Sequence, residues 1–112
     1  MQSMDLDRAP FAFVKLDPSL RVTAWSGGAA RMFGVSAAEA LGGDVGALIA
    51  VREPGFWAGL RVGSEGPRVA TWVAADGTSR VIEWESQVER AADGAVVATA
   101  CYGRDVTART SQ

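Results

Sequence analysis

The sequence predicts an α+β domain in which short helices lie on one antiparallel sheet. Three observations lead to this prediction. Strand-like segments gather at both ends of the 112-residue chain, short glycine-bounded helical segments fill its middle, and Asp-Gly turns join the later strands. Strands grouped at the two ends with helices between them are typical of α+β architecture. The expected order is therefore two strands, three or four short helices, and three strands.

The first two strands are expected over residues 11–16 and 21–25. The first is a nearly continuous apolar run, and the second alternates polar and apolar residues. Between them, Asp17-Pro18-Ser19 predicts a β-turn, because proline presets φ for the second turn position. Residues 11–25 are therefore predicted to form a β-hairpin.

The next segment predicts two short helices with glycine ends. Gly27-Gly28 is expected to break the second strand, and a helix is expected from Ala29 to Phe33. Gly34 is expected to end that helix in a left-handed conformation. Ser36 and Glu39 have the spacing of a capping box, which opens a second helix that Gly42-Gly43 ends.

Residues 44–63 show two further helical patterns. Val45, Leu48 and Ile49 have helical spacing, and Asp44 is placed to cap them. Phe56, Trp57 and Leu60 again fit one helical face. Pro54 is expected to begin that last helix, since its missing N–H costs nothing in a first turn.

Three strands are expected after the loop at 63–67. They span residues 68–74, 78–90 and 95–102, and Asp76-Gly77 and Asp93-Gly94 form the turns between them. The middle strand alternates: Ile82, Trp84, Ser86 and Val88 share one face, and acidic residues or Gln87 occupy the other. The last strand is rich in small and β-branched residues, which favours a central position.

The bulk composition excludes several classes of function. An apolar fraction of 48%, a charged fraction of 21% and a net charge of −2 are those of one ordinary globular domain. The arginines are scattered, so no nucleic-acid partner is expected. No run approaches the ~20 apolar residues that a membrane span needs. With Cys101 as the single cysteine, we expect a cytoplasmic location.

The chain contains no histidine. This excludes histidine-based acid–base catalysis, nucleophile pairs that depend on histidine, and haem held by a histidine. With one cysteine and no histidine, no metal site is expected either. Glu83, Glu85 and Glu89 form an acidic stripe that suits a solvated strand face better than a metal site or a general base.

The order of elements and several motifs together resemble the PAS domain family. The similarity extends over nearly the whole chain, roughly residues 10–109. The motifs that carry it are Phe11-Ala-Phe-Val-Lys-Leu-Asp17, Arg21-Val-Thr-Ala-Trp25, Ala29-Ala30-x-x-Phe33-Gly34-x-Ser36-x-x-Glu39-x-x-Gly42, Arg80-Val-Ile-Glu-Trp84, Ala92-Asp93-Gly94 and Gly103-Arg104-Asp105-Val106-Thr107. The family usually has an asparagine where Ser26 stands and often a tyrosine where Val35 stands.

The resemblance implies a sheet of about five strands in the order 2-1-5-4-3, with short helices on one face. Residues 1–9 would be a flank, 10–109 the PAS domain, and 110–112 the start of a linker or tail. It also implies that Asp105 and Thr107 anchor the exit of the last strand, from which a signal leaves. A simple turn is the alternative, since Asp and Thr readily bond nearby backbone.

Ligands of PAS domains generally lie between the helices and the sheet. The candidates for contacting a small apolar ligand there are Phe33, Ile49, Trp57, Leu60 and Trp72. Most of these aromatic side chains would be expected in a core in any case. Trp72 and Trp84 could equally lie on the outer face of the sheet, where an apolar patch would serve dimerisation.

No cofactor is evident from the sequence. Flavin photosensors of the family carry a reactive cysteine in a Gly-x-Asn-Cys-Arg-Phe motif, which is absent here, and Cys101 lies in an expected strand. A buried structural cysteine is therefore the better interpretation.

The resemblance implies a non-catalytic sensory and protein-interaction domain, with a homodimer and an output module such as a histidine kinase as its partners. A ligand-free dimerisation or docking module is the first alternative. The second is a small α+β isomerase-like enzyme, in which Asp17 or Glu83 would be the base.

Overall fold

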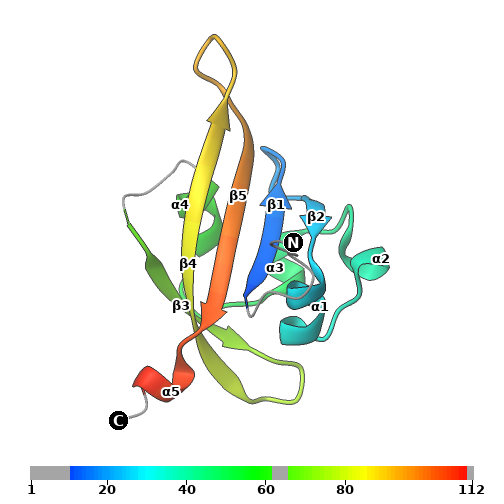
Figure 1. The fold of residues 1–112 in the computed structure, drawn as a ribbon, viewed down its shortest axis with the longest axis vertical. Coiled ribbons are helices and arrows are strands. Elements are labelled where there is room, and N and C mark those ends of the chain that lie inside the picture. Colours follow the sequence, from blue (N-terminus) through cyan, green and yellow to red (C-terminus); the bar gives the residue numbers. More distant parts are fainter. Residues whose placement is uncertain (1–10, 62–65, 111–112) are drawn as a thin grey trace, which may run out of the picture.

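The computed structural model, which describes residues 11–61 and 66–110, confirms the α+β architecture (Figure 1). The strands are β1 (Ala12–Leu16), β2 (Val22–Trp25), β3 (Arg68–Val73), β4 (Ser79–Arg90) and β5 (Val96–Asp105). The helices are α1 (Gly27–Phe33), α2 (Ala37–Ala40), α3 (Val45–Leu48), α4 (Phe56–Arg61) and α5 (Thr107–Thr110). The strands form one antiparallel sheet in the order β2-β1-β5-β4-β3, as expected, with β5 in the centre.

The core lies between one face of the sheet and α1 to α4, and Figure 1 shows α3 and α4 behind the strands and α2 to the side of β2. We call this side of the sheet the inner face and the opposite side the outer face. Along β1, Ala12, Val14 and Leu16 point to the inner face and are fully buried, while Phe13 and Lys15 point outward and are half-buried. This alternation follows from the two-residue period of a strand.

The first hairpin forms as predicted. The Asp17 carbonyl accepts a hydrogen bond from the Leu20 N–H, and its carboxylate accepts from the N–H groups of Ser19 and Arg21. The turn closes with Leu20 in a left-handed conformation at φ 66°. The chain thereby reverses at Pro18 and β2 returns beside β1.

The second strand ends before Gly27-Gly28, as expected, but the prediction that the helix begins at Ala29 was wrong. Both glycines belong to the first turn of α1. Ser26 caps the helix, because its Oγ accepts from the Ala29 N–H at 3.1 Å, and it also accepts from the Phe13 N–H at 3.0 Å. One buried hydroxyl therefore joins the start of α1 to β1.

The other caps agree with the sequence, except at α4. Gly34 ends α1 at φ 72°, Ser36 and Glu39 form the full capping box of α2, and Asp44 caps α3. Pro54 does not begin α4, which starts at Phe56. Gly55 separates them at φ 73°, a left-handed conformation that a right-handed helix cannot contain.

Loop segments cover both outer edges of the sheet. On the β2 side, the Val22 N–H donates to the Gly43 carbonyl and the Gly42 N–H donates to the Val22 carbonyl. On the β3 side, the Arg52 N–H donates to the Thr71 carbonyl, and the Val73 N–H to the Ala50 carbonyl. These bonds use backbone groups that a bare edge strand would leave open.

The long β4–β5 hairpin reaches beyond the other strands (Figure 1). Its strands pair from Ile82↔Asp105 to Arg90↔Val96. The last strand was predicted to end at Tyr102 but runs to Asp105, because Gly103 and Arg104 continue the pairing with β4. No helix within the described residues is long and apolar enough to cross a membrane.

Candidate functional site: the inner aromatic cluster and the exit of β5

The structure brings the five candidate ligand-contacting residues into one buried layer. Phe33 comes from α1, Trp57 and Leu60 from α4, Trp72 from β3, and Ile49 from the end of α3. All five are buried, with exposed fractions of 8% or less. The Trp57 indole N–H donates to the Ile49 carbonyl at 3.1 Å, which fixes α4 against the end of α3.

Trp84 lies at the centre of this layer. Its ring stacks on Phe33, with centroids 6.0 Å apart and planes 7° from parallel, and meets Trp57 edge-on at 5.0 Å. Phe33 also meets Trp72 edge-on at 4.9 Å. The alternative that Trp72 and Trp84 lie on the outer face is therefore wrong, because α1 and α4 supply aromatic partners on the inner face that the strand pattern alone does not show.

Three polar side-chain atoms on β4 and β5 are buried and have no hydrogen-bond partner among the residues that the structure describes. They are the Trp84 Nε1, the Ser86 Oγ and the Thr99 Oγ1. Ser86 pairs with Cys101 and Thr99 with Val88, so the two hydroxyls occupy neighbouring positions on the inner face. Buried polar atoms normally have partners, and an unpaired one costs free energy. These atoms are therefore places where a polar group of a small molecule would gain hydrogen bonds.

The exit of β5 is tied to β4 by a compact hydrogen-bond network. Thr107 Oγ1 accepts from the Val81 N–H at 2.9 Å and donates to Asp105 Oδ1. Asp105 Oδ2 accepts from Arg80 Nη1 at 3.1 Å, and the Val106 N–H donates to the Val81 carbonyl at 2.8 Å. The structure thus brings together the two predicted exit residues and adds Arg80 and Val81.

The surroundings of Asp105 favour its charged form. Burial pushes the pKa of this carboxyl upward, but hydrogen bonds from Thr107 and the charge and hydrogen bond of Arg80 outweigh burial. The pKa of Asp105 is therefore lowered from its ordinary value. The exit network contains a stable carboxylate rather than a proton-exchanging acid.

Cys101 lies on the inner face of β5, fully buried. Desolvation raises the pKa of its thiol to about 12, so the thiolate that reacts with electrophiles or flavins is suppressed. This environment does not suit a cysteinyl-flavin step, as the missing sequence motif already indicates.

Neither carboxylate considered as a catalytic base faces the aromatic layer. Asp17 accepts backbone hydrogen bonds within the β1–β2 turn, and Glu83 lies on the outer face, paired with Arg104 at 2.6 Å. In the part of the chain that the structure describes, no group of three or more His, Cys, Asp or Glu side chains is placed to hold a metal ion.

Sequence reasoning did not place Trp84 among the ligand-contacting candidates, and it assigned no site role to Arg80 or Val81. The alternation of β4 places Trp84 beside Ile82, which was a signal for the inner face. Gly103 was a second signal, because a strand glycine often marks a close approach. Nothing in the sequence indicates that Arg80 and Val81 hold the exit of β5, since this role depends on the pairing of β4 with β5.

No family model and no curated protein sequence matches this chain. Solved structures do match. The PAS domain of a protein from Colwellia psychrerythraea is 21% identical, with a TM-score of 0.72 over 93% of this chain and 92% of that one. The PAS domain of nitrogen regulation protein NR(II) from Vibrio parahaemolyticus is 17% identical, with a TM-score of 0.67 over 89% and 93%.

A third similar structure is an RNA-binding light-oxygen-voltage receptor. It is 21% identical, with a TM-score of 0.74 over 93% of this chain but only 32% of that one. All three identities are low, so these likenesses establish architecture and not activity. The strand order, the position of the helices on one face and these structural matches agree: the chain has the fold of PAS domains.

Proposed function

We propose that this chain is a sensory and protein-interaction domain of a bacterial signalling protein. A ligand or partner changes the packing between the helices and the sheet, and the change reaches an output module through the exit of β5. The mechanism is a shift between two populated conformations, biased by whatever binds one of them better.

The network at Asp105 and Thr107 is the observation that carries this proposal. Arg80 and Val81 precede Ile82 and Trp84 on β4 and fasten the start of α5. Because Trp84 lies in the aromatic layer, a displacement of its ring would move the backbone to which α5 is attached. A structural change at the inner face therefore needs to pass along only a few residues of β4 to reach α5.

The ligand proposed for the inner face is small and mainly apolar, with at least one hydrogen-bonding group. Phe33, Ile49, Trp57, Leu60 and Trp72 supply its apolar surroundings. The Ser86 and Thr99 hydroxyls and the Trp84 indole N–H supply unused polar atoms. A purely apolar molecule would leave these atoms unpaired, so it would bind less well.

The PAS fold supports the remaining parts of the proposal. The domain acts without catalysis, binds no cofactor through Cys101, forms a homodimer, and passes its signal to a module such as a histidine kinase in the cytoplasm. A matched PAS domain from a two-component sensor histidine kinase supports this choice of output.

A small-molecule screen by ¹⁵N NMR tests the proposal. A ligand of the inner face should shift the Trp84 indole N–H resonance and also the backbone amides of Val106, Thr107 and Ala108. In the Thr107→Val variant, the indole shift should remain and the shifts in α5 should shrink. A ligand that moves the indole while leaving residues 106–108 unchanged would contradict transmission through the exit.

A ligand-free dimerisation or docking module is the second candidate. The tight mutual packing of Phe33, Trp57 and Trp84 favours it, because these rings already fill one another's contact surfaces. Mass spectrometry of the purified protein, a ligand screen and light scattering separate the candidates. A stable dimer with no co-purifying molecule and no thermal shift with any ligand would favour docking.

A further inference from the structure

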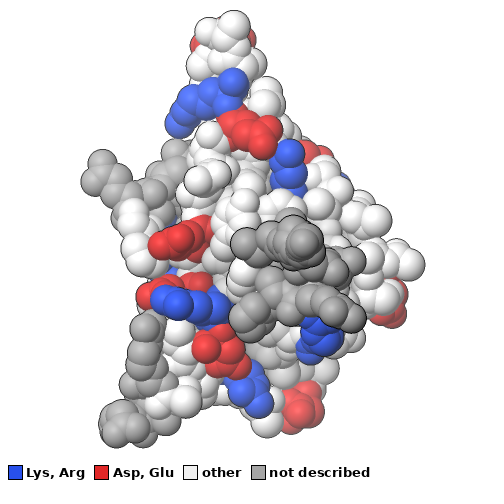
Figure 2. All heavy atoms as spheres, in the orientation of Figure 1, with Lys and Arg blue, Asp and Glu red and all other residues white. Residues whose placement is uncertain are grey.

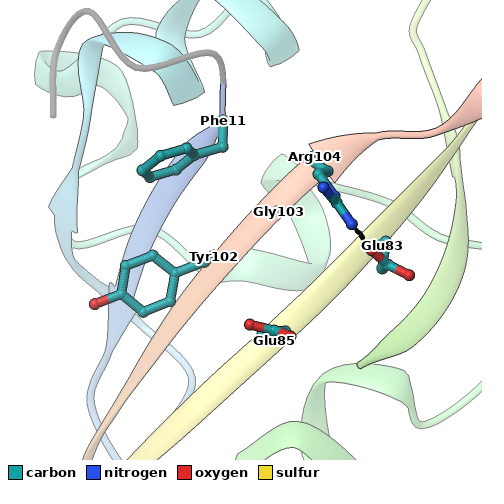
Figure 3. Close-up of a pocket in the computed structure, with 6 residues that line it drawn as sticks. All are labelled: Phe11, Glu83, Glu85, Tyr102, Gly103 and Arg104. Atoms are coloured by element: carbon teal, nitrogen blue, oxygen red, sulfur yellow. Dashed lines mark hydrogen bonds and ion pairs between the residues drawn. The ribbon is translucent and has the colours of Figure 1, made fainter. Parts of the chain in front are cut away.

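The outer face of the sheet contains a groove that the proposed sensory role does not use. It has a volume of about 370 Å³ and is lined by Phe11, Glu83, Glu85, Tyr102, Gly103 and Arg104 (Figure 3). A second hollow of about 440 Å³, lined by Gly66, Glu85, Ser86, Gln87 and Tyr102, continues from it. Glu85 and Tyr102 line both hollows, so they lie where the two meet. We call the two hollows together the outer groove.

One wall of the outer groove is aromatic. The Tyr102 ring lies 5.1 Å from the Phe13 ring and 6.2 Å from the Phe11 ring, measured between centroids. Phe13 and Tyr102 are paired across β1 and β5. The contacts with Phe11 and Phe13 hold the Tyr102 ring in place, so the half-buried ring offers a fixed aromatic surface to the groove.

The other wall is acidic and only partly neutralised. Glu83 pairs with Arg104, as the dashed line in Figure 3 shows, and Glu89 pairs with Lys15 at 3.2 Å. The Glu85 side chain is exposed and has no hydrogen bond or ion pair within the described residues, although it interacts electrostatically with Arg104 across the groove. Glu85 is also directly opposite Tyr102 in the β4–β5 pairing, and Figure 3 shows the Tyr102 ring turned toward β1, with the Glu85 carboxylate on the β4 side of the groove.

A carboxylate and an aromatic ring that line the same groove can together hold an organic cation. The carboxylate attracts the charge, and the ring attracts a Lys or Arg head group that lies over its face. Figure 2 shows acidic and basic side chains lying together on this side of the molecule. The charged side chains that line the groove are Glu83, Glu85 and a single cation, Arg104, so two carboxylates share one positive charge and the groove is negative on balance.

A second copy of this chain is a poorer occupant than a basic partner. Glu83, Glu85 and Glu89 project from alternate positions of the outer face of β4. If two copies packed these faces together, carboxylates of one copy would lie near carboxylates of the other. The cations Lys15 and Arg104 could separate them only by leaving their present ion pairs with Glu89 and Glu83. Like charges brought together at an interface cost free energy and so select against self-association.

We propose that the outer groove docks a basic segment of a partner protein, with one Arg or Lys side chain held between Glu85 and Tyr102. Successive outward positions of β4 are about 6.6 Å apart, twice the rise per residue of a strand. A partner with basic residues at alternate positions of an extended segment would meet Glu85 and, at the next outward position, Glu83. This docking is independent of ligand binding at the inner face.

A peptide-binding measurement tests the proposal. The probe is a fluorescent nine-residue peptide in which arginine alternates with threonine, and its partner probe has citrulline in place of arginine. Citrulline keeps the shape of the side chain and lacks its charge. Anisotropy should show saturable binding of the arginine peptide, at least about tenfold weaker binding of the citrulline peptide, and weaker binding at high salt.

Variants assign the binding to the groove. Glu85→Gln and Tyr102→Leu should each weaken binding by about threefold to tenfold, whereas Tyr102→Phe should keep it, because the ring and not the hydroxyl holds the cation. Asp76→Asn is the matched control: it removes one negative charge at the β3–β4 turn and keeps the oxygen that accepts from Thr78. It should leave the affinity nearly unchanged.

Several results would overturn the proposal. Equal binding of the arginine and citrulline peptides would show that binding does not depend on the cation. Equal weakening by Glu85→Gln and Asp76→Asn would show that the peptide does not bind in the groove. A concentration-dependent dimer that shifts the NMR resonances of Glu85 and Tyr102, without peptide binding, would assign the groove to a second copy. Loss of peptide binding leaves the indole and α5 shifts of the sensory proposal untouched, so the two proposals fail separately.

Discussion

The six-membered ring of Trp84 lies directly on the backbone of Gly103, its partner across β4 and β5. A Cβ atom at position 103 would lie 2.7 Å from Cζ3 of the indole and 2.8 Å from Cε3 and Cη2. Real Cβ atoms do not approach other atoms so closely. The glycine is therefore required by the ring above it, and not by a turn or a positive φ.

Gly103→Ala should destabilise the domain. The indole cannot move aside easily, because Phe33 stacks on it and Trp57 meets its edge. Overpacking of this kind costs about 1–3 kcal/mol. Urea unfolding measures the loss, and the Trp84→Leu background is the control, since a smaller side chain there should make Gly103→Ala markedly less costly. Equal costs in both backgrounds would contradict the contact.

Ser26→Ala should cost more than Ser36→Ala, although both residues cap helices. Ser26 is buried and its hydroxyl accepts from two backbone N–H groups, Phe13 and Ala29. Its loss leaves two donors without a partner, for about 2 kcal/mol or more. Ser36 is exposed, and water replaces its bond, so about 1 kcal/mol is expected. Chemical denaturation of both variants gives the comparison, and an equal loss would argue against the double role of Ser26.

Thr107→Val should loosen α5 from the sheet. The valine keeps the shape of threonine but offers no acceptor to the Val81 N–H. Hydrogen exchange of the Val81 amide should accelerate by about tenfold or more, whereas the amides of β1 should keep their protection. The global unfolding free energy should fall by about 1 kcal/mol. Unchanged exchange at Val81 would show that the hydroxyl is not its partner in solution.

Asp105 should contribute to stability in a pH-dependent way. Its folded-state pKa is lowered, burial being outweighed by Thr107 and Arg80. Its contribution is therefore present above the unfolded-state pKa of about 3.9 and is lost as the pH falls through the lower folded-state pKa. Urea unfolding of wild type and Asp105→Asn should differ most near pH 6 and converge toward pH 2. A constant difference across this range would exclude the linkage.

Cys101 should not react in the folded protein. Burial raises the pKa of its thiol to about 12, and no part of the residue is exposed. At pH 8, labelling by a thiol reagent should proceed only as fast as the protein opens, and it should become rapid in urea. Rapid labelling under native conditions would require a conformation in which β5 is uncovered.

Local signals in the sequence predicted most of the fold. The capping box of Ser36 and Glu39, the cap at Asp44 and the Asp-Gly turns depend on neighbouring residues, so the sequence displays them directly. The predicted start of a helix was wrong where two local sequence preferences conflicted. Pro54 suits a first helical turn, but Gly55 after it takes a left-handed conformation, and α4 therefore starts later.

The parts of the site that depend on pairing between distant strands were not predictable in the same way. The face occupied by Trp72 and Trp84 follows from the placement of α1 and α4, which no local pattern specifies. The outer groove likewise depends on the register that sets Glu85 opposite Tyr102. That five aromatic and aliphatic residues bind a ligand stays a prediction, because their burial alone is what any core would require.

The central place of β5 has a consequence for the way the chain folds. β1 pairs with β5, so Leu16 must find Thr99 before the sheet can close. Contacts between the two ends of a chain carry a large loop-closure entropy and slow the folding transition. On a ribosome that adds about 5–20 residues per second, β1 would wait several seconds for its partner. During that interval only the β1–β2 hairpin, the β3–β4 hairpin and the short helices have local partners, which makes the synthesis of β5 the step that commits the domain to its native structure.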